Sequence, residues 1–177
     1  MFPTRRASYL VISATVLTLS WEQRKLGEVA DRYDNMRVPI TAADRVSGST
    51  PYYGANGIQD FVEGYTHQGE FVLIAEDGAS DLDNYPTICV NGTIWVNNHA
   101  HVIQGKSRIA SNHYITWCLK QCDIKPLLTG GTRAKLNAEV LMNLEFNLPS
   151  YGEQCQIGGF FNQLDNLITL HLREPPY

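Results

Sequence analysis

The stretch SYGEQCQIGGFFNQLDNLITLHLREPP, residues 150–176, carries the clearest structural signal in the chain. Ser150 and Glu153 have the Ser-x-x-Glu spacing of a capping box, in which each side chain satisfies a backbone N–H at a helix start. This spacing predicts a helix that begins at about Tyr151. We therefore expect the chain to end in a helix.

Apolar residues recur along this predicted helix at alternating spacings of three and four residues, as in a coiled-coil seam. The stripe runs through Ile157, Phe160, Leu164, Leu167 and His171, and Phe161 and Ile168 widen it. We expect its apolar members to bind a partner helix. In the alternative interpretation, the stripe packs against the domain that precedes it.

The segments before this helix mix strand and helix patterns. An uninterrupted apolar run at residues 70–75 predicts a buried strand. Residues 87–96 hold Asn91-Gly92 between two apolar runs, which predicts a hairpin with a type I′ turn. Residues 144–148 alternate apolar and polar, which predicts a half-buried strand, and a helical pattern begins near Ser107. The fold class predicted is α+β, a mixed, strand-rich domain followed by a C-terminal helix.

The segment LLTGGTRAKLN, residues 127–137, places two cations directly after a pair of glycines. Gly130 and Gly131 allow the backbone to approach a ligand closely, because no Cβ intervenes. Thr132 supplies a hydroxyl, and Arg133 and Lys135 supply charge for phosphate oxygens. Arg133 could also donate two hydrogen bonds to the edge of a guanine base. Such a contact contributes roughly 1–3 kcal/mol of discrimination against other bases. This loop is therefore a candidate DNA contact.

A second candidate group surrounds Asn56-Gly57, which is a two-residue turn signal between Tyr53 and residues 58–61. Asn56 and Gln59 carry the amide type that reads adenine, and Tyr52 and Tyr53 precede them. In the alternative interpretation, the tyrosines belong to the core and the amides only form the turn.

Charge is unevenly distributed along a chain that holds 14 basic and 18 acidic residues, a net charge of −4. This balance excludes a wholly basic nucleic-acid binder, but not a local basic patch. Residues 57–83 contain seven acidic residues and no Lys or Arg. Residues 106–135 contain six basic residues and a single acidic residue, Asp123. We expect Lys106, Arg108 and the later cations to face DNA phosphates, and the acidic segment to face away or toward protein. In the alternative interpretation, both are solvated faces.

Catalytic motifs are missing from the sequence: it contains no nucleophile elbow, phosphate-binding loop, HExxH or GxGxxG. A metal-dependent hydrolytic site built from Glu76, Asp77, His99 and His101 is the enzymatic alternative. The four cysteines fit no common zinc pattern, and we expect a reducing cytoplasm rather than a disulfide framework.

The first twenty residues form an atypical segment. Arg5 and Arg6 precede an apolar run at residues 9–19, which resembles a secretory signal but is too short to span a bilayer. The residues around Ser20 lack a small-x-small cleavage site. A buried strand is the alternative, and we expect no membrane association.

Five segments, in this order, closely resemble the specificity subunit of type I restriction-modification systems. They are WEQRKLGEVAD (21–31), YYGANGIQDFVEGYTHQGEFVLIAEDGA (52–79), NGTIWVNNHAHV (91–102), GGTRAKLNAEVLMNLEFNLPS (130–150) and EQCQIGGFFNQLDNLITLHLRE (153–174).

The resemblance implies a DNA target-recognition domain at residues 21–149 and the start of a spacer helix at residues 150–177. In that family the specificity subunit is non-catalytic. It reads split DNA sites and docks methyltransferase subunits and a restriction subunit. We therefore expect no cofactor on this chain, with S-adenosylmethionine, ATP and Mg²⁺ on the partner subunits.

Two departures from the family pattern are visible. Only one recognition domain is present, and Pro175 and Pro176 stop the spacer helix where the family continues it. We expect a truncated or rearranged subunit with an out-of-family segment at residues 1–20. Half-subunits of this kind could pair with each other. A fragment that binds the methyltransferase without reading DNA is the main alternative.

Overall fold

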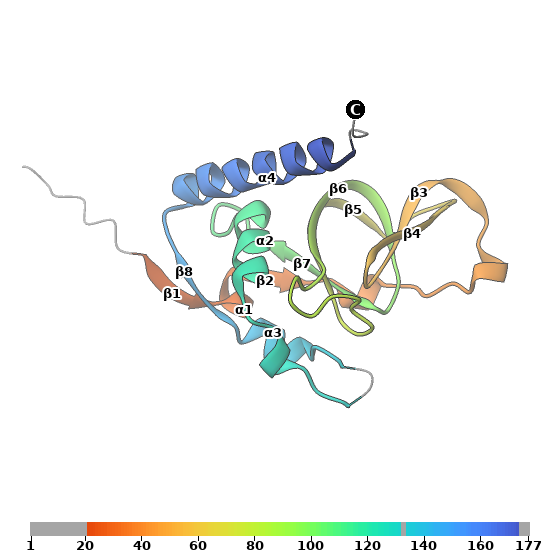
Figure 1. The fold of residues 1–177 in the computed structure, drawn as a ribbon, viewed down its shortest axis with the longest axis horizontal. Coiled ribbons are helices and arrows are strands. Elements are labelled where there is room, and N and C mark those ends of the chain that lie inside the picture. The colour runs from red at the N-terminus through yellow and green to blue at the C-terminus, as the bar shows by residue number, and fades with distance from the viewer. Residues whose placement is uncertain (1–20, 132–133, 174–177) are drawn as a thin grey trace, which may run out of the picture.

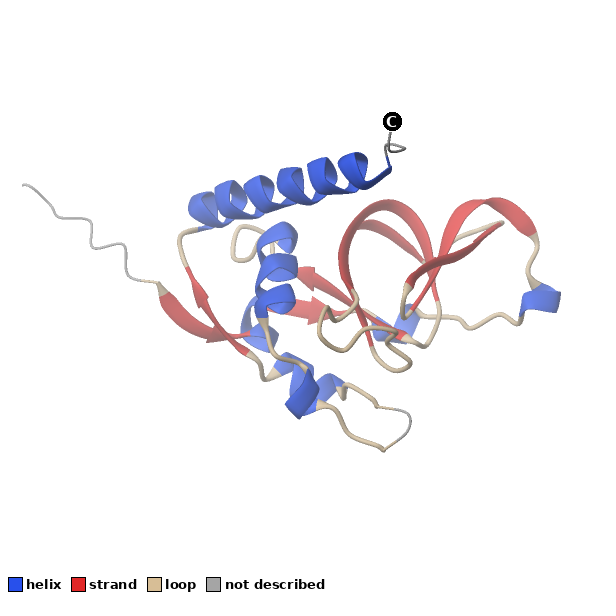
Figure 2. Ribbon diagram, viewed as in Figure 1, coloured by secondary structure: helices blue, strands red, loops and turns tan. Residues whose placement is uncertain are grey.

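Two β-sheets form the framework of the chain (Figures 1 and 2). The computed structural model describes residues 21–131 and 134–173, and of residues 170–173 it describes the backbone alone. The segment at residues 1–20 therefore lies outside the described residues. The larger sheet holds six strands in the spatial order β2-β7-β5-β6-β3-β4, all antiparallel to their neighbours except β3 and β6. The strands are β2 Ala30–Arg32, β3 Ser47–Gly54, β4 Gly57–Val62, β5 His67–Ala75, β6 Thr87–Val96 and β7 Ala100–Gly105.

The smaller sheet ties the beginning of the described chain to the strand that precedes the last helix. It pairs β1, Glu22–Lys25, with β8, Glu145–Leu148, in antiparallel register. Phe146 and Leu148 of β8 are buried and alternate with exposed residues. The half-buried strand predicted at residues 144–148 is confirmed.

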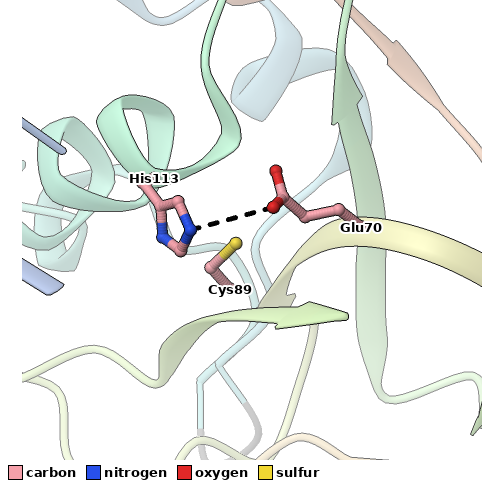
Figure 3. Close-up of side chains that lie close together, drawn as sticks. All are labelled: Glu70, Cys89 and His113. Carbon is pink, nitrogen blue, oxygen red and sulfur yellow. Dashed lines mark ion pairs between the residues drawn. The ribbon is translucent and has the colours of Figure 1, made fainter. Parts of the chain in front are cut away.

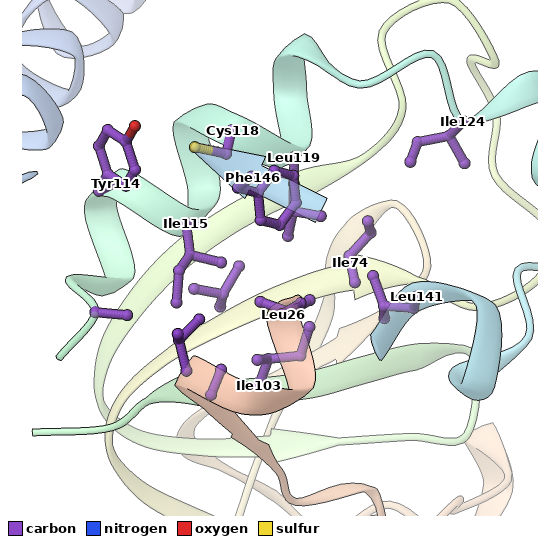
Figure 4. Packing of buried hydrophobic residues seen from close by; sticks show 14 of the residues in the cluster. Leu26, Ile74, Ile103, Tyr114, Ile115, Cys118, Leu119, Ile124, Leu141 and Phe146 are labelled. Atoms are coloured by element: carbon purple, nitrogen blue, oxygen red, sulfur yellow. The ribbon is translucent and has the colours of Figure 1, made fainter. Parts of the chain in front are cut away.

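Strand β5 is the centre of the fold because both of its faces are buried. Val72 and Ile74 pack in the larger hydrophobic cluster, which joins the sheet to the helices (Figure 4). Phe71 and Leu73 point to the opposite face and pack in a second cluster. Each such side chain contributes about 1.5–3 kcal/mol by leaving water. A strand buried on both faces needs an uninterrupted apolar run, and the strand predicted at residues 70–75 is confirmed.

The hairpin predicted at Asn91-Gly92 is wrong. Residues 87–96 form one continuous strand, β6, which pairs along most of its length with β5. Gly92 lies opposite Gly69 of β5, and their φ angles are 111° and 137°, a region that favours glycine. Pairing with an earlier strand outweighed the local turn signal, so this dipeptide marks a bend in a two-stranded ribbon.

The other predicted turn does reverse the chain. Strands β3 and β4 form a hairpin in which Gly54 pairs with Gly57, so that Ala55 and Asn56 form the turn. The turn lies one residue earlier than the Asn56-Gly57 signal suggests.

Short helices cover the face of the sheet that carries the larger cluster. They are α1 Leu26–Val29, α2 Asn112–Gln121 and α3 Ala138–Met142, with single 3₁₀ turns at Asp34–Met36, Ala42–Asp44 and Lys125–Leu127. Helix α2 starts later than the pattern near Ser107 predicts, because Arg108 adopts a φ of 58° in a tight turn. Across the described ranges, no helix is long and apolar enough to span a bilayer. The mixed strand and helix content confirms the α+β prediction.

The last helix, α4, spans Tyr151–Arg173 and starts at the predicted capping box. The Ser150 N–H donates to the Glu153 carboxylate at 3.0 Å, and the Glu153 N–H donates to Ser150 Oγ at 3.4 Å. The helix start at Tyr151 is therefore confirmed.

Helix α4 lies across α2 with close backbone contact (Figure 1). A Cβ on Gly158 would lie 2.6 Å from the Tyr114 amide nitrogen. The buried Gln154 side chain accepts a hydrogen bond from the Ser111 N–H at 3.0 Å and donates to the Ile109 carbonyl at 3.0 Å. The domain therefore fixes the position of the N-terminal half of α4.

This crossing predicts opposite effects for two adjacent glycines. Gly158→Ala should lower the free energy of unfolding by about 1–3 kcal/mol, because the methyl group is forced against the α2 backbone. Gly159→Ala should raise it by about 0.5–1 kcal/mol, because a Cβ there meets nothing within 4 Å and alanine favours helix. Urea unfolding of both variants measures the difference, and equal effects would contradict the crossing.

Candidate nucleic-acid interface

Four connections meet at one end of the larger sheet. They are the β3–β4 turn, the β5–β6 loop at residues 76–86, the β6–β7 turn at residues 97–99, and the loop at residues 129–135. Hydrogen bonds join them: Asn56 Nδ2 donates to the Gly78 carbonyl at 2.9 Å, and His99 Nδ1 lies 2.6 Å from Asp77 Oδ1. Segments far apart in the sequence thereby form one loop cluster.

The loop at residues 129–135 has a closed base. The Thr129 N–H donates to the Lys135 carbonyl at 2.9 Å, and the Lys135 N–H donates to the Thr129 carbonyl at 2.8 Å. Gly130 is exposed with a φ of 86°, which lets the chain turn out of this pair. Thr132 and Arg133, two of the predicted DNA contacts, lie outside the described residues. Gly131 and Lys135 lie within them, and both are exposed.

A buried carboxylate anchors this base to the sheet. Glu76 follows β5 and is 8% exposed. Its Oε1 lies 2.6 Å from Lys135 Nζ and its Oε2 lies 2.5 Å from Arg37 Nη1. The Leu136 N–H also donates to the Glu76 carbonyl at 2.7 Å. Burial by itself would raise the pKa of Glu76, but the hydrogen bonds from Lys135 and Arg37 outweigh it, and the pKa is lowered.

A second, partly buried carboxylate supports the same anchor. Asp34 Oδ2 lies 2.7 Å from His101 Nδ1, and His101 Nε2 lies 2.9 Å from the Leu136 carbonyl. Burial of Asp34 opposes its ionisation, but His101, the Val102 N–H and Arg37 together lower its pKa. Arg37 and Asp34 were missed in the sequence because nothing in their local pattern shows that they approach residue 136.

The other predicted contacts divide between this cluster and other places. Both ends of the Asn56 amide form hydrogen bonds within the cluster, because its Oδ1 also accepts the Ser80 N–H at 2.8 Å. Gln59 is exposed, and its Oε1 accepts a hydrogen bond from Asn97 at 3.3 Å. Tyr52 and Tyr53 are buried. The tyrosines therefore lie in the core, as the alternative interpretation has it.

Lys106 and Arg108 do not join the cluster. They follow the C-terminal end of β7, whereas His99 precedes its N-terminal end. Lys106 Nζ donates to the Glu28 carbonyl at 2.9 Å, so it holds α1. Arg108 is exposed in the turn before α2. The structure thus separates these two cations from the loop at residues 129–135 by the length of a strand.

The predicted separation of acidic and basic segments is wrong. Lys125 Nζ lies 2.5 Å from Asp83, and Lys135 Nζ lies 2.6 Å from Glu76. Lys125 and Lys135 therefore pair with anions of residues 57–83, because the segments that carry them pack at the same end of the sheet.

The hydrolase alternative is not favoured by the geometry. Glu76 and His101 approach within 3.7 Å, and with Asp34 they could reach one metal ion. However, both Glu76 oxygens already accept hydrogen bonds from Lys135 and Arg37. A cation at this position would have to displace two others.

The predicted partner stripe on α4 divides into two faces. Ile157, Phe161 and Leu164 are partly buried, and the Phe161 ring stacks on Trp117 of α2 with centroids 5.0 Å apart. Phe160, Leu167 and Ile168 are 57%, 61% and 57% exposed. Ile168 lines the groove beside α2 together with Phe161, so Phe160 and Leu167 form the edge of the stripe that points away from the domain.

Residues 19–175 match the family model described as the type I restriction modification DNA specificity domain. The chain therefore belongs to this family, which is the family that the five sequence segments resemble.

Individual relatives agree with this assignment. A candidate type I restriction enzyme specificity subunit of Haemophilus influenzae is 46% identical over 148 residues, which are 84% of this chain and 38% of that protein. The crystal structure of the type I restriction-modification S subunit from M. genitalium superposes with a TM-score of 0.69 at 15% identity, covering 87% of this chain and 42% of that one. The HsdS subunit of Thermoanaerobacter tengcongensis gives 0.53 at 14% identity, covering 89% and 40%. The chain thus spans about two fifths of these relatives.

The depressed pKa of Glu76 predicts a pH-dependent stability. A carboxylate whose pKa is lower in the folded chain stabilises fully above its ordinary value of 4.5, and the contribution is lost as the pH falls through the folded value. At neutral pH Glu76→Gln should cost about 3 kcal/mol, because Arg37 and Lys135 lose their common partner. The difference from wild type should stay constant above pH 4.5 and shrink as the pH falls below it. Glu63→Gln, a change at an exposed carboxylate, is the control and should show no such trend in urea unfolding.

Proposed function

We propose that this chain recognises a short half-site in duplex DNA as the non-catalytic specificity subunit of a type I restriction-modification complex. Its role would be to direct methylation and cleavage performed by other subunits. The observation that carries the proposal is the family match over residues 19–175.

The loop cluster is the part of the domain that we assign to DNA. The loop at residues 129–135 is anchored at its base by Glu76, and the exposed Gly130 and Gly131 leave room for close approach of a phosphate. Lys135 keeps 46% of its side chain exposed although it pairs with Glu76. Phosphate contacts of this kind fix register, and base edges are then read by neighbouring side chains. Arg133 and Gln59 are the candidates for base reading.

The partners follow from the same proposal. Methyltransferase subunits and a restriction subunit would dock on this chain and would carry S-adenosylmethionine, ATP and Mg²⁺. The chain itself would need no cofactor for recognition, and the complex would act in the cytoplasm. Pairing between two copies of this chain would supply a second recognition domain.

Selection from a randomised duplex pool tests the proposal. The chain would be co-expressed with its methyltransferase subunit and selected at two salt concentrations. We expect an enriched short motif and an affinity that falls steeply as salt rises, because phosphate contacts release counterions. Arg133→Ala and Lys135→Ala should each flatten the slope of log affinity against log salt by about 0.9.

The control for these variants is Lys25→Ala, since β1 lies far from the loop cluster (Figure 1). Urea unfolding of Lys135→Ala is also needed, because this change removes a partner of Glu76. Salt slopes and motifs that match wild type in folded variants would exclude the loop from the interface.

A second candidate function rests on the exposed face of α4. Phe160 and Leu167 present apolar side chains to solvent, and a chain that only docks on the methyltransferase would need no more than this face. In that case the chain would copurify with the methyltransferase and enrich no DNA motif.

The double variant Phe160→Gln with Leu167→Gln tests whether this part of α4 docks the methyltransferase subunit. It should lower affinity for the methyltransferase subunit at least tenfold, because apolar anchors dominate helix docking. Gln156→Ala with Gln163→Ala, at exposed polar positions of the same helix, is the control. Pull-down with the purified methyltransferase measures the effect, and equal retention of both double variants would rule out this face as the docking surface.

A further inference from the structure

Three residues with metal-binding side chains meet where α2 crosses the sheet (Figure 3). Glu70 comes from β5, Cys89 from β6 and His113 from the first turn of α2. One ligand atom from each lies within 4.8 Å of the others. In the sequence these residues are widely separated and show no zinc spacing, so only the tertiary structure brings them together.

Neighbouring groups orient the Glu70 carboxylate. Asn112 Nδ2 donates to Glu70 Oε1 at 2.9 Å, and Glu70 Oε2 lies 3.8 Å from His113 Nε2. Asn112 is itself fixed, because its Oδ1 accepts the Gly105 N–H at 2.7 Å. Support of this kind holds a ligand in place before a metal binds.

The cluster opens into a groove between α2, α4 and the start of β6. The groove has a volume of about 490 Å³, and Cys89 and His113 line it together with Thr116, Trp117 and Lys120. A fourth ligand, such as water, could therefore reach an ion held by the three side chains. Three protein ligands and one open position form a common arrangement for Zn²⁺.

We propose that Glu70, Cys89 and His113 bind one Zn²⁺ ion, with the fourth coordination position facing the groove. The mixed sulfur, nitrogen and oxygen set matches the preferences of this borderline cation. The proposal stands apart from DNA recognition, because it uses none of the residues of the loop cluster.

A second three-residue cluster differs from this one because cations already pair with its carboxylates. Asp34, Glu76 and His101 lie equally close, but Arg37 and Lys135 already neutralise the Glu76 oxygens. Among the side chains described, those of residues 21–131 and 134–169, no lysine or arginine forms an ion pair with Glu70. Only the Glu70 cluster therefore offers its carboxylate to an added cation.

The ion would fasten α2 to the central strands. His113 also contributes to the close crossing of α2 and α4, since a Cβ on Gly158 would lie 2.8 Å from the His113 carbonyl carbon. A metal at this point would thus stabilise both the domain and the direction in which α4 leaves it.

Binding should release a proton from the thiol. Burial, and then the negative charge of Glu70, raise the pKa of Cys89 to about 12, so the metal-free residue is a neutral thiol. Thiolate is the form that coordinates zinc, so a bound ion would displace this proton.

Titration of the full-length, tag-free chain with Co²⁺ tests the site, because Co²⁺ replaces Zn²⁺ and gives a thiolate-to-metal absorption band. We expect one ion per chain, displaced by Zn²⁺, and a Zn²⁺-dependent rise in the melting temperature. Cys89→Ser should abolish the absorption band, and His113→Gln should weaken Zn²⁺ binding at least tenfold and remove the rise in melting temperature.

Cys155→Ser is the matched control, since Cys155 is an exposed free cysteine on α4. It should bind as wild type does. If Cys89→Ser fails to fold, the partly exposed His113 provides the decisive variant. Absence of stoichiometric binding to wild type, a band that persists in Cys89→Ser, or unchanged affinity in His113→Gln would each overturn the proposal.

Discussion

The loop cluster depends on one buried carboxylate, that of Glu76. Its two oxygens hold Arg37 and Lys135, which come from the segment after β2 and from the base of the loop at residues 129–135. Removing either cation would leave one oxygen of this buried carboxylate without its ion-pair partner, which is destabilising. The base of the loop is therefore fixed, whereas its exposed glycines carry no such constraint.

Internal pairing of the cations limits what charge alone can do in this chain. Lys106 and Lys125 are bound to acidic or carbonyl groups of neighbouring elements, and the net charge is negative. Long-range attraction for a polyanion is therefore weak. Under the proposed function, we infer that partner subunits supply much of the phosphate attraction. The recognition domain would then contribute register and base reading.

The contacts between α2 and α4 fix the direction of α4 relative to the domain. A partner docked on α4 would therefore have a fixed orientation relative to the domain. Gly158 permits close backbone contact with α2, and Phe161 stacks on Trp117. The Gln154 side chain accepts a hydrogen bond from Ser111 and donates one to Ile109. These contacts restrain the helix on one face and leave Phe160 and Leu167 exposed on the other. Under the proposed function, a helix held rigidly in this way would keep a docked partner at a constant distance from the DNA that the domain would read. The proposed zinc site lies beside this junction and would reinforce it.

The sequence by itself determined the features that depend on neighbours along the chain. The capping box at Ser150, the doubly buried β5 and the alternating β8 were all predictable, because backbone periodicity and caps are local. Tertiary pairing decided the rest. Asn91-Gly92 became a bend because β5 was available as a partner for the whole of β6. Lys135 turned toward Glu76, and Glu70 met Cys89 and His113, because folding brings distant residues together in ways that spacing does not encode.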